Sequence, residues 1–155
     1  MIEKEELLSI IPHRGKMLLL DKVNSYNLEE RSIETEYQIT EGCIFYDSEA
    51  GGVPAWAGFE FIAQSISAFS GIRGKKKGGA PKIGFILAVS KLQMDLPFLK
   101  SGSIITIKTK EIENLAPVYV FEGEIYLDGK RVTIGSLTVM DADDAQLKII
   151  KKENE

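Results

Sequence analysis

Apolar residues occupy every face of the segment from Gly52 to Gly74, GVPAWAGFEFIAQSISAFSGIRG, and leave no polar side for solvent. This pattern predicts one long helix that begins near Pro54, because proline is tolerated in a first turn, and that ends at Gly71 and Gly74. A helix that is apolar all round is normally buried. We therefore expect it to form the centre of a folded domain, with no insertion into a membrane.

Two polar residues interrupt this helix one turn apart, Glu60 and Gln64, and Ser67 and Gly71 continue the same stripe. A carboxylate on a buried helix is costly unless it is paired or used in chemistry. Glu60 is therefore the strongest candidate for a functional residue, and the alternative is a structural pairing with an arginine or a backbone N–H. Gln64 cannot transfer protons usefully near neutral pH, so we expect it to orient Glu60 or to line a substrate tunnel.

The chain before this helix contains three shorter patterns. Ile2 to Ile11 predicts an amphipathic helix that ends at Pro12. The apolar run from Lys16 to Val23 is consistent with a buried strand, and the alternation from Arg31 to Thr40 predicts a strand with one buried and one wet face. Glu41 to Val53 has no period and holds several glycines, which is typical of a loop.

After the helix, a basic connector from Lys75 to Pro81 leads into residues with almost continuous strand character. The dipeptide Asp128-Gly129 is a hairpin signal between the last two of these strands. Residues 141–155 are mostly charged and are expected to form a C-terminal tail. The predicted strands are Ile83–Met94, Ile104–Ile112, Val118–Leu127 and Val132–Met140.

Two strands before a long buried helix and four strands after it favour an α+β fold. In this fold an antiparallel sheet of about six strands wraps around one central helix. A chain of 155 residues is long enough for one domain with a sizeable core, which we place at residues 1–140. An open sheet leaves exposed edge strands that often pair with a second copy, so we expect a homodimer.

The composition narrows the possible chemistry. The net charge of -4 and the pI of about 5.2 give no reason to expect binding to nucleic acid. A single cysteine, Cys43, excludes an internal disulfide, and a single histidine, His13, excludes a metal centre built from several histidines of one chain. The N-terminus is charged and amphipathic and does not read as a signal peptide, so we expect a cytoplasmic protein.

Three segments resemble one protein family, in the right order and with sensible spacing. The sequence IPHR at 11–14, followed by 17–23, is similar to an N-terminal PHR…LLVDRV motif. The segment at 60–64 resembles the EAMAQ start of a central helix, and 121–129 resembles a closing FEGEAYVDG hairpin. The family is that of the hot-dog-fold β-hydroxyacyl-(acyl carrier protein) dehydratases, in particular their predicted-dehydratase relatives found with aryl-polyene-type lipid clusters. The match spans residues 2–140.

The resemblance implies a homodimer of hot-dog folds with active sites at the dimer interface. Members of the family convert 3-hydroxyacyl thioesters to trans-2-enoyl thioesters without a metal or redox cofactor. The resemblance therefore implies a thioester of acyl carrier protein or coenzyme A as the substrate. The usual catalytic pair is a histidine on the loop before the helix and a carboxylate on the helix, and Glu60 falls on the carboxylate position.

The loop histidine of the family is missing from this chain. Tyr46 stands fourteen residues before Glu60, where that histidine is expected. His13 could replace it as the base, or it could be a packed turn residue beside Pro12, and both interpretations remain open. Tyr46 is a weaker candidate, because a phenol with a reference pKa of about 10 is a poor base but can donate a hydrogen bond.

Dehydration also needs donors that hold the thioester oxygen while negative charge develops on it. The predicted start of the helix offers free N–H groups at Ala55 and Trp56 and a favourable helix dipole. The basic residues Arg73 and Lys75 to Lys77 are either a solvated loop or a rim that steers an acidic carrier protein. The candidate substrate-binding residues are Ala55, Trp56, Gln64 and Tyr46.

Three functions therefore compete. The first is dehydration of a 3-hydroxyacyl thioester with His13 and Glu60 as the catalytic pair. The second is a hot-dog acyl thioesterase, in which the carboxylate on the helix activates water and no histidine is required. The third is a partner subunit that binds an acyl group and has lost catalysis.

Overall fold

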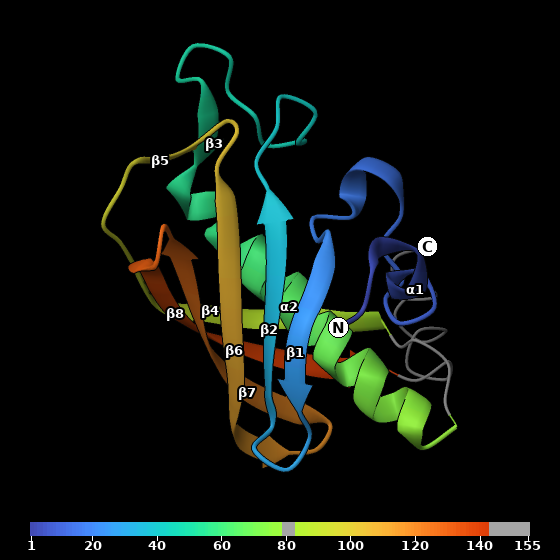
Figure 1. The fold of residues 1–155 in the computed structure, drawn as a ribbon. Coiled ribbons are helices and arrows are strands. Elements are labelled where there is room, and N and C mark those ends of the chain that lie inside the picture. The colour runs from blue at the N-terminus through green and yellow to red at the C-terminus, as the bar shows by residue number, and fades with distance from the viewer. Residues whose placement is uncertain (79–82, 143–155) are drawn as a thin grey trace, which may run out of the picture.

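The computed structural model describes residues 1–78 and 83–142. Six strands form one antiparallel sheet in the order β1-β2-β6-β7-β8-β4, and this sheet curls around the long helix α2 (Figure 1). Two further strands, β3 and β5, form a separate ribbon near the start of α2. The predicted α+β fold is confirmed. The elements are α1 (Lys4–Leu7), η1 (Gly15–Met17), β1 (Lys22–Asn27), β2 (Ser32–Gln38), β3 (Gly52–Pro54), η2 (Ala55–Ala57), α2 (Gly58–Lys76), β4 (Ile83–Met94), β5 (Phe98–Lys100), β6 (Ile104–Leu115), β7 (Val118–Leu127) and β8 (Lys130–Ala142).

Helix α2 begins later than the sequence predicted, at Gly58 rather than near Pro54. The residues of β3 pair with β5, and the 3₁₀ turn η2 then leads into the helix. Pro54 has a ψ of 135°, the extended conformation of a strand residue, so it precedes the helix instead of opening it. The prediction failed because a proline signals the start of a helix and the end of a strand equally well.

Gly71 does not end the helix, which continues to Lys76. A β-carbon at Gly71 would overlap the carbonyl oxygen and the side chain of Ile10, so the close approach of the N-terminal segment requires glycine here. The predicted helix in that segment is also shorter than expected, because only Lys4–Leu7 are helical. The residues after it turn so that Ile10 and Ile11 are buried.

The run from Lys16 to Val23 is not the single strand that its hydrophobicity suggested. It begins within the 3₁₀ turn η1, continues as a buried connection at Leu18 to Leu20, and enters β1 only at Lys22. Such an apolar run is buried in either arrangement. Its composition alone therefore cannot distinguish a strand from a packed irregular segment.

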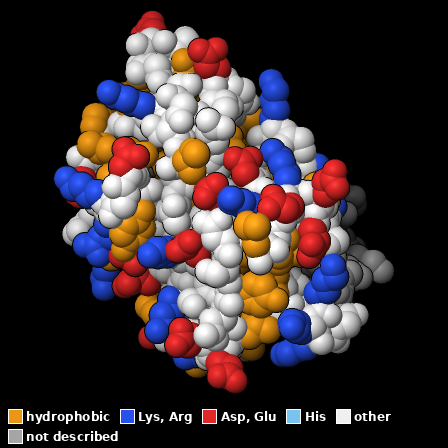
Figure 2. All heavy atoms as spheres, in the orientation of Figure 1, with side chains coloured by type: hydrophobic (Ala, Val, Ile, Leu, Met, Phe, Trp, Pro, Cys, Tyr) orange, Lys and Arg blue, Asp and Glu red, His pale blue; other side chains and the backbone are white. Residues whose placement is uncertain are grey.

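The outer face of the sheet is a solvated, charged surface. Buried residues alternate with more exposed ones along β2, as its sequence predicted. On the outer face Lys108 lies between Glu34 and Glu124 in the strand register and forms an ion pair with Glu34 at 3.8 Å. Acidic and basic side chains are mixed across this face in Figure 2. Opposite charges on neighbouring strands stabilise such a face modestly.

Strand β4 is an edge of the sheet, since in the described residues its only partner in the six-stranded sheet is β8. Its Ile86, Leu87 and Val89 are each more than a third exposed. A long apolar edge strand is a template for pairing with another chain. This edge therefore has the character of an interface.

The end of the sheet extends past the predicted domain boundary at residue 140. Strand β8 continues to Ala142, so Asp141 belongs to the sheet and not to the tail. The rest of the predicted tail, residues 143–155, lies outside the described residues. Within the described part of the chain, no helix combines the length and the hydrophobicity needed to span a membrane.

Candidate active site

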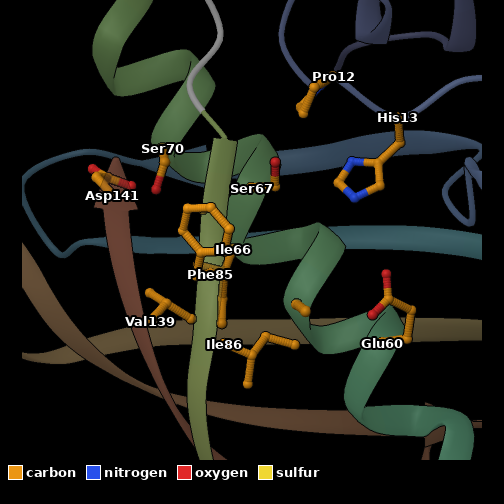
Figure 3. Close-up of a pocket in the computed structure, with 12 residues that line it drawn as sticks. Pro12, His13, Glu60, Ile66, Ser67, Ser70, Phe85, Ile86, Val139 and Asp141 are labelled. Atoms are coloured by element: carbon orange, nitrogen blue, oxygen red, sulfur yellow. The ribbon is translucent and has the colours of Figure 1, made fainter. Parts of the chain in front are cut away.

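A pocket of about 150 Å³ opens between one face of α2, the start of β4 and the end of β8 (Figure 3). Helix α2 contributes Glu60, Ala63, Ser67 and Ser70, whose spacing of three or four residues places them on one face. The N-terminal segment contributes His13. The remaining lining residues are Pro12, Ile66, Gly84, Phe85, Ile86, Val139 and Asp141.

His13 and Glu60 both face this pocket, although they are far apart in the sequence. Figure 3 shows the carboxyl group of Glu60 pointing toward the imidazole ring of His13. Both side chains are partly buried. The structure thus brings a basic and an acidic group of suitable chemistry to one cavity.

Gln64 joins the helix to the segment that follows His13. Its side chain is almost fully buried, and its Oε1 accepts a hydrogen bond from the N–H of Leu19 at 2.7 Å. Its Nε2 donates to the carbonyl oxygen of Met17 at 2.7 Å and to Oε1 of Glu60 at 3.2 Å. One amide therefore fixes the buried connection at Leu19 and also holds the Glu60 carboxyl group.

Replacing Gln64 with alanine should destabilise the protein by about 2 kcal/mol, because the buried N–H of Leu19 and the carbonyl of Met17 would both lose their partner. Urea unfolding of the wild type and the variant measures this loss. A free energy of unfolding unchanged within about 0.5 kcal/mol would contradict the role given to this amide.

Arg14 holds the turn that carries His13. Its guanidinium group donates hydrogen bonds to the carbonyl oxygens of Leu8 at 2.6 Å, Ile11 at 2.7 Å and His13 at 2.8 Å. Carbonyl groups beyond the end of a helix have no helical partner, and Arg14 supplies one. The backbone leading to His13 is thereby fixed although it lacks regular secondary structure.

The surroundings of His13 lower its pKa from the usual value of 6.5. Burial is the main cause, because the charged imidazolium loses solvation; the negative charge of Glu60 opposes the lowering, and the positive charge of Arg14 adds to it. The Nδ1 atom is buried and has no hydrogen-bond partner among the described residues. The imidazole is therefore neutral near pH 7, which is the state in which it can accept a proton.

This electrostatic balance predicts the titration of His13. As the chain has one histidine, a single imidazole signal follows its protonation in an NMR titration of tag-free protein. We expect a pKa below 6.5, and a lower value still in Glu60→Gln, because the charge that favours the imidazolium is removed. A pKa at or above that of the urea-unfolded chain would contradict the described burial.

Comparison with known proteins identifies the family. A family model described as ApeP-like, ApeP dehydratase, matches residues 5–150. The chain belongs to the ApeP-like dehydratase family. The 3-hydroxyacyl-(acyl-carrier-protein) dehydratase FabZ of Erythrobacter litoralis is 27% identical over 142 residues, which cover 90% of this chain and 92% of the relative. The FabZ enzyme of Sulfurimonas denitrificans is also 27% identical, over 89% of this chain and 95% of its own length.

Solved structures agree with the hot-dog fold of this ApeP-like dehydratase. The dehydratase heterocomplex ApeI:P from Xenorhabdus doucetiae contains a chain that aligns with a TM-score of 0.85 and 23% identity, covering 96% of this chain and 97% of that one. A hypothetical thioesterase protein from Streptococcus pneumoniae TIGR4, solved with coenzyme A, gives a TM-score of 0.60 at 14% identity and covers 78% and 84% of the two chains. At these identities the two structures establish the shared fold.

The other predicted site residues of this ApeP-like dehydratase do not line the pocket. The N–H of Ala55 donates to the carbonyl oxygen of Pro97 at 2.9 Å, so the expectation that it is free to hold an oxyanion is wrong. Trp56 is 52% exposed and its ring packs edge-on against Phe45. Tyr46 is partly buried and packs against the hydrophobic core.

Sequence reasoning overlooked several residues that line the pocket. The residue pattern alone does not single out Ser70, and it assigns Asp141 to the C-terminal tail. The face of α2 that meets the pocket continues from Glu60 through Ala63 and Ser67, and this helical periodicity is the signal that could have identified Ser70. The sequence holds no such signal for Asp141, because its pattern predicts that the last strand ends at Met140, whereas β8 continues to Ala142.

Arg73 is not part of a solvated basic loop, as one interpretation of its neighbourhood held. Its Nη1 contacts both carboxylate oxygens of Glu111 at 3.1 Å, and the Glu111 side chain is fully buried. The guanidinium also lies over the rings of Phe69 and Tyr119, at 4.8 and 5.3 Å from their centroids. Arg73 therefore stabilises the buried Glu111 carboxylate and packs against the core, whereas Lys75 and the two lysines after it are exposed.

Proposed function

We propose that this protein dehydrates a 3-hydroxyacyl thioester to the trans-2-enoyl thioester, with His13 as the base and Glu60 as the acid. The observation that carries the proposal is the convergence of these two side chains on one pocket (Figure 3). Membership of the ApeP-like dehydratase family and relatives named 3-hydroxyacyl-(acyl-carrier-protein) dehydratases support the reaction class. The neutral state of His13 suits the role of a base.

In this mechanism His13 takes a proton from C2, the carbon next to the thioester carbonyl. In the form of the pair that carries its shared proton on Glu60, the carboxyl group gives this proton to the 3-hydroxyl group, the C3–O bond breaks and water leaves. The electron pair of the former C2–H bond becomes the C2=C3 double bond. At the end of the turnover His13 carries a proton and Glu60 has lost one, and transfer between these facing groups restores the starting state.

We further propose that the β4 edge pairs with a second copy of the chain. The exposed Ile86, Leu87 and Val89 support this pairing, and the pocket borders the same strand at Phe85 and Ile86. A partner would therefore help to close the pocket. The related Xenorhabdus structure is a heterocomplex, so size-exclusion chromatography with light scattering of the purified chain is the test: a monomer would point to a different partner.

The substrate is proposed to arrive on acyl carrier protein, which is named in the relatives' activity. The exposed lysines at 75–77 would favour an acidic carrier by long-range attraction, which is expected to weaken with added salt. We place the reaction in the cytoplasm, because the single cysteine, Cys43, is free and buried and suits a reducing compartment.

One assay separates dehydration from the competing functions. The purified chain is incubated with a 3-hydroxybutyryl thioester, and the enoyl thioester and the free thiol are measured in parallel. Enoyl product without thiol release is the expected result. Thiol release would identify the thioesterase, and saturable binding without either product would identify a non-catalytic subunit.

A further inference from the structure

The imidazole ring of His13 is not anchored by a regular element of the fold. The residue lies between the end of α1 at Leu7 and the 3₁₀ turn η1, which begins at Gly15. Its Nδ1 atom is buried and has no hydrogen-bond partner among the described residues. A catalytic side chain needs support from residues around it to keep a productive geometry. For His13 this support must come through the backbone.

Arg14 supplies the hydrogen bond that holds this backbone. Its Nη1 donates to the carbonyl oxygen of His13 at 2.8 Å and to that of Ile11 at 2.7 Å, so one nitrogen binds the chain on both sides of the turn. Its Nη2 donates to the carbonyl oxygen of Leu8 at 2.6 Å. Within the described part of the chain, His13 forms no other hydrogen bond. The placement of its ring therefore depends on the guanidinium group of Arg14.

Arg14 is itself connected to helix α2, which carries Glu60. The carbonyl oxygen of Arg14 accepts a hydrogen bond from the N–H of Met17 at 3.1 Å, and the carbonyl oxygen of Met17 accepts one from Gln64 at 2.7 Å. Gln64 also donates to Oε1 of Glu60 at 3.2 Å. A continuous series of hydrogen bonds thus joins the proposed acid to the proposed base, and such a series can couple two groups energetically. Arg14 is its last member before His13.

The chemistry of arginine suits this place better than that of any other cation. The side chain of Arg14 is largely exposed, yet it forms no ion pair with the described residues and directs its donors to carbonyl groups. A guanidinium group is planar and holds its N–H donors in fixed directions, so it can bind several carbonyls in one geometry. An ammonium group on a flexible stem has the same charge but lacks this fixed arrangement.

We propose that Arg14 is a positioning residue, which acts through His13 by holding its imidazole against the carboxyl group of Glu60 (Figure 3). The inference rests on the proposed dehydration, because it states how the base of that reaction is placed. A displacement of about 1 Å can lower a rate by about 10²-fold. We expect Arg14→Met to lower kcat for a 3-hydroxybutyryl thioester by about 10–100-fold and to change KM by less than about threefold. Arg14→Lys should lose less, because the ammonium group can still bind part of the carbonyl set.

The position of His13 can also be measured without activity. The charge of Glu60 raises the pKa of His13, so the amount by which Glu60→Gln lowers this pKa reports how close the two groups lie. The other charged groups at the pocket are Arg14 and, at its far end, Asp141 of β8. NMR titration of the single imidazole gives the effect of Glu60→Gln in the wild type and in Arg14→Met. We expect a much smaller effect in Arg14→Met, because the ring is no longer held against the carboxyl group.

The comparison separates positioning from charge and from general stability. Removing the positive charge of Arg14 raises the pKa of His13 with and without Glu60, so this contribution cancels. An arginine that only stabilised the fold would leave the effect of Glu60→Gln unchanged. Arg131→Met removes an exposed arginine of β8 and is the matched control: neither kcat nor the effect of Glu60→Gln should change.

Two results would overturn the proposal. The first is an effect of Glu60→Gln that is as large in Arg14→Met as in the wild type, and the second is a kcat of Arg14→Met within about twofold of the wild-type value. Urea unfolding checks that Arg14→Met is folded under the assay conditions, and Arg14→Lys replaces it in both measurements if it is not. A wild type without turnover would refute the proposed dehydration, whereas the titration would still decide the role of Arg14.

Discussion

Replacing His13 with alanine is expected to lower kcat for dehydration by about 10²–10⁴-fold, because no other histidine can take the proton from C2. Glu60→Gln should cause a loss of similar size, since an amide keeps the shape of the carboxyl group but cannot donate its proton to the leaving hydroxyl. The measurement is formation of the enoyl thioester by the purified variants, with folding checked by circular dichroism.

Two comparisons make this result specific. Glu113→Gln removes an exposed carboxylate on β6, and its activity should equal that of the wild type. The double variant of His13 and Glu60 should be little worse than either single variant, because residues that act as a unit are not additive. A His13→Ala protein that keeps more than about a tenth of the wild-type rate would exclude His13 as the base.

Arg73→Met is expected to reduce the free energy of unfolding by about 3–5 kcal/mol, because it leaves the fully buried Glu111 carboxylate without its closest cation. The remaining charged neighbour, Arg31, is 3.7 Å away and partly exposed, so it cannot replace the two contacts at 3.1 Å. Urea unfolding of the variant and the wild type measures the loss.

A surface pair provides the matched control for this measurement. Arg131 and Glu124 approach to 3.0 Å, but Arg131 is about half exposed, so Arg131→Met should reduce the free energy of unfolding far less than Arg73→Met does. The double variant Arg73→Met/Glu111→Leu should recover most of the lost stability, since it removes the buried charge with its partner. Equal losses in Arg73→Met and Arg131→Met would contradict the buried pair.

The elements with a strong hydrophobic period were predictable from the sequence. Strands β4 and β7 have the bounds that their residues predicted, and the turn at Asp128-Gly129 joins β7 to β8 with both residues at positive φ. The motif at 121–124 also has a physical reason: Phe121 is buried, and a β-carbon at Gly123 would overlap Ile62 of α2. In such places the local pattern and the tertiary packing require the same residues.

The rest depended on contacts that no local pattern contains. The N-terminal segment is irregular, and its position follows from the hydrogen bonds of Gln64 with Leu19 and Met17, which are distant from it in the sequence. Glu111 continues the inward alternation of Ile105 and Ile107, so its burial could have been inferred from the period of two in β6. The pairing of Glu111 with Arg73 of α2 could not have been inferred, because a strand pattern does not say which helix residue lies opposite.

The contact between Gly71 and Ile10 suggests how this protein could lose its activity without unfolding. Glu60 is part of helix α2, whereas His13 belongs to the N-terminal segment, which only packs against that helix. This packing is possible because Gly71 has no side chain. A larger residue at position 71 would displace the N-terminal segment, while the sheet and helix α2 stayed intact. Such a protein would keep its secondary structure and would still lack dehydratase activity.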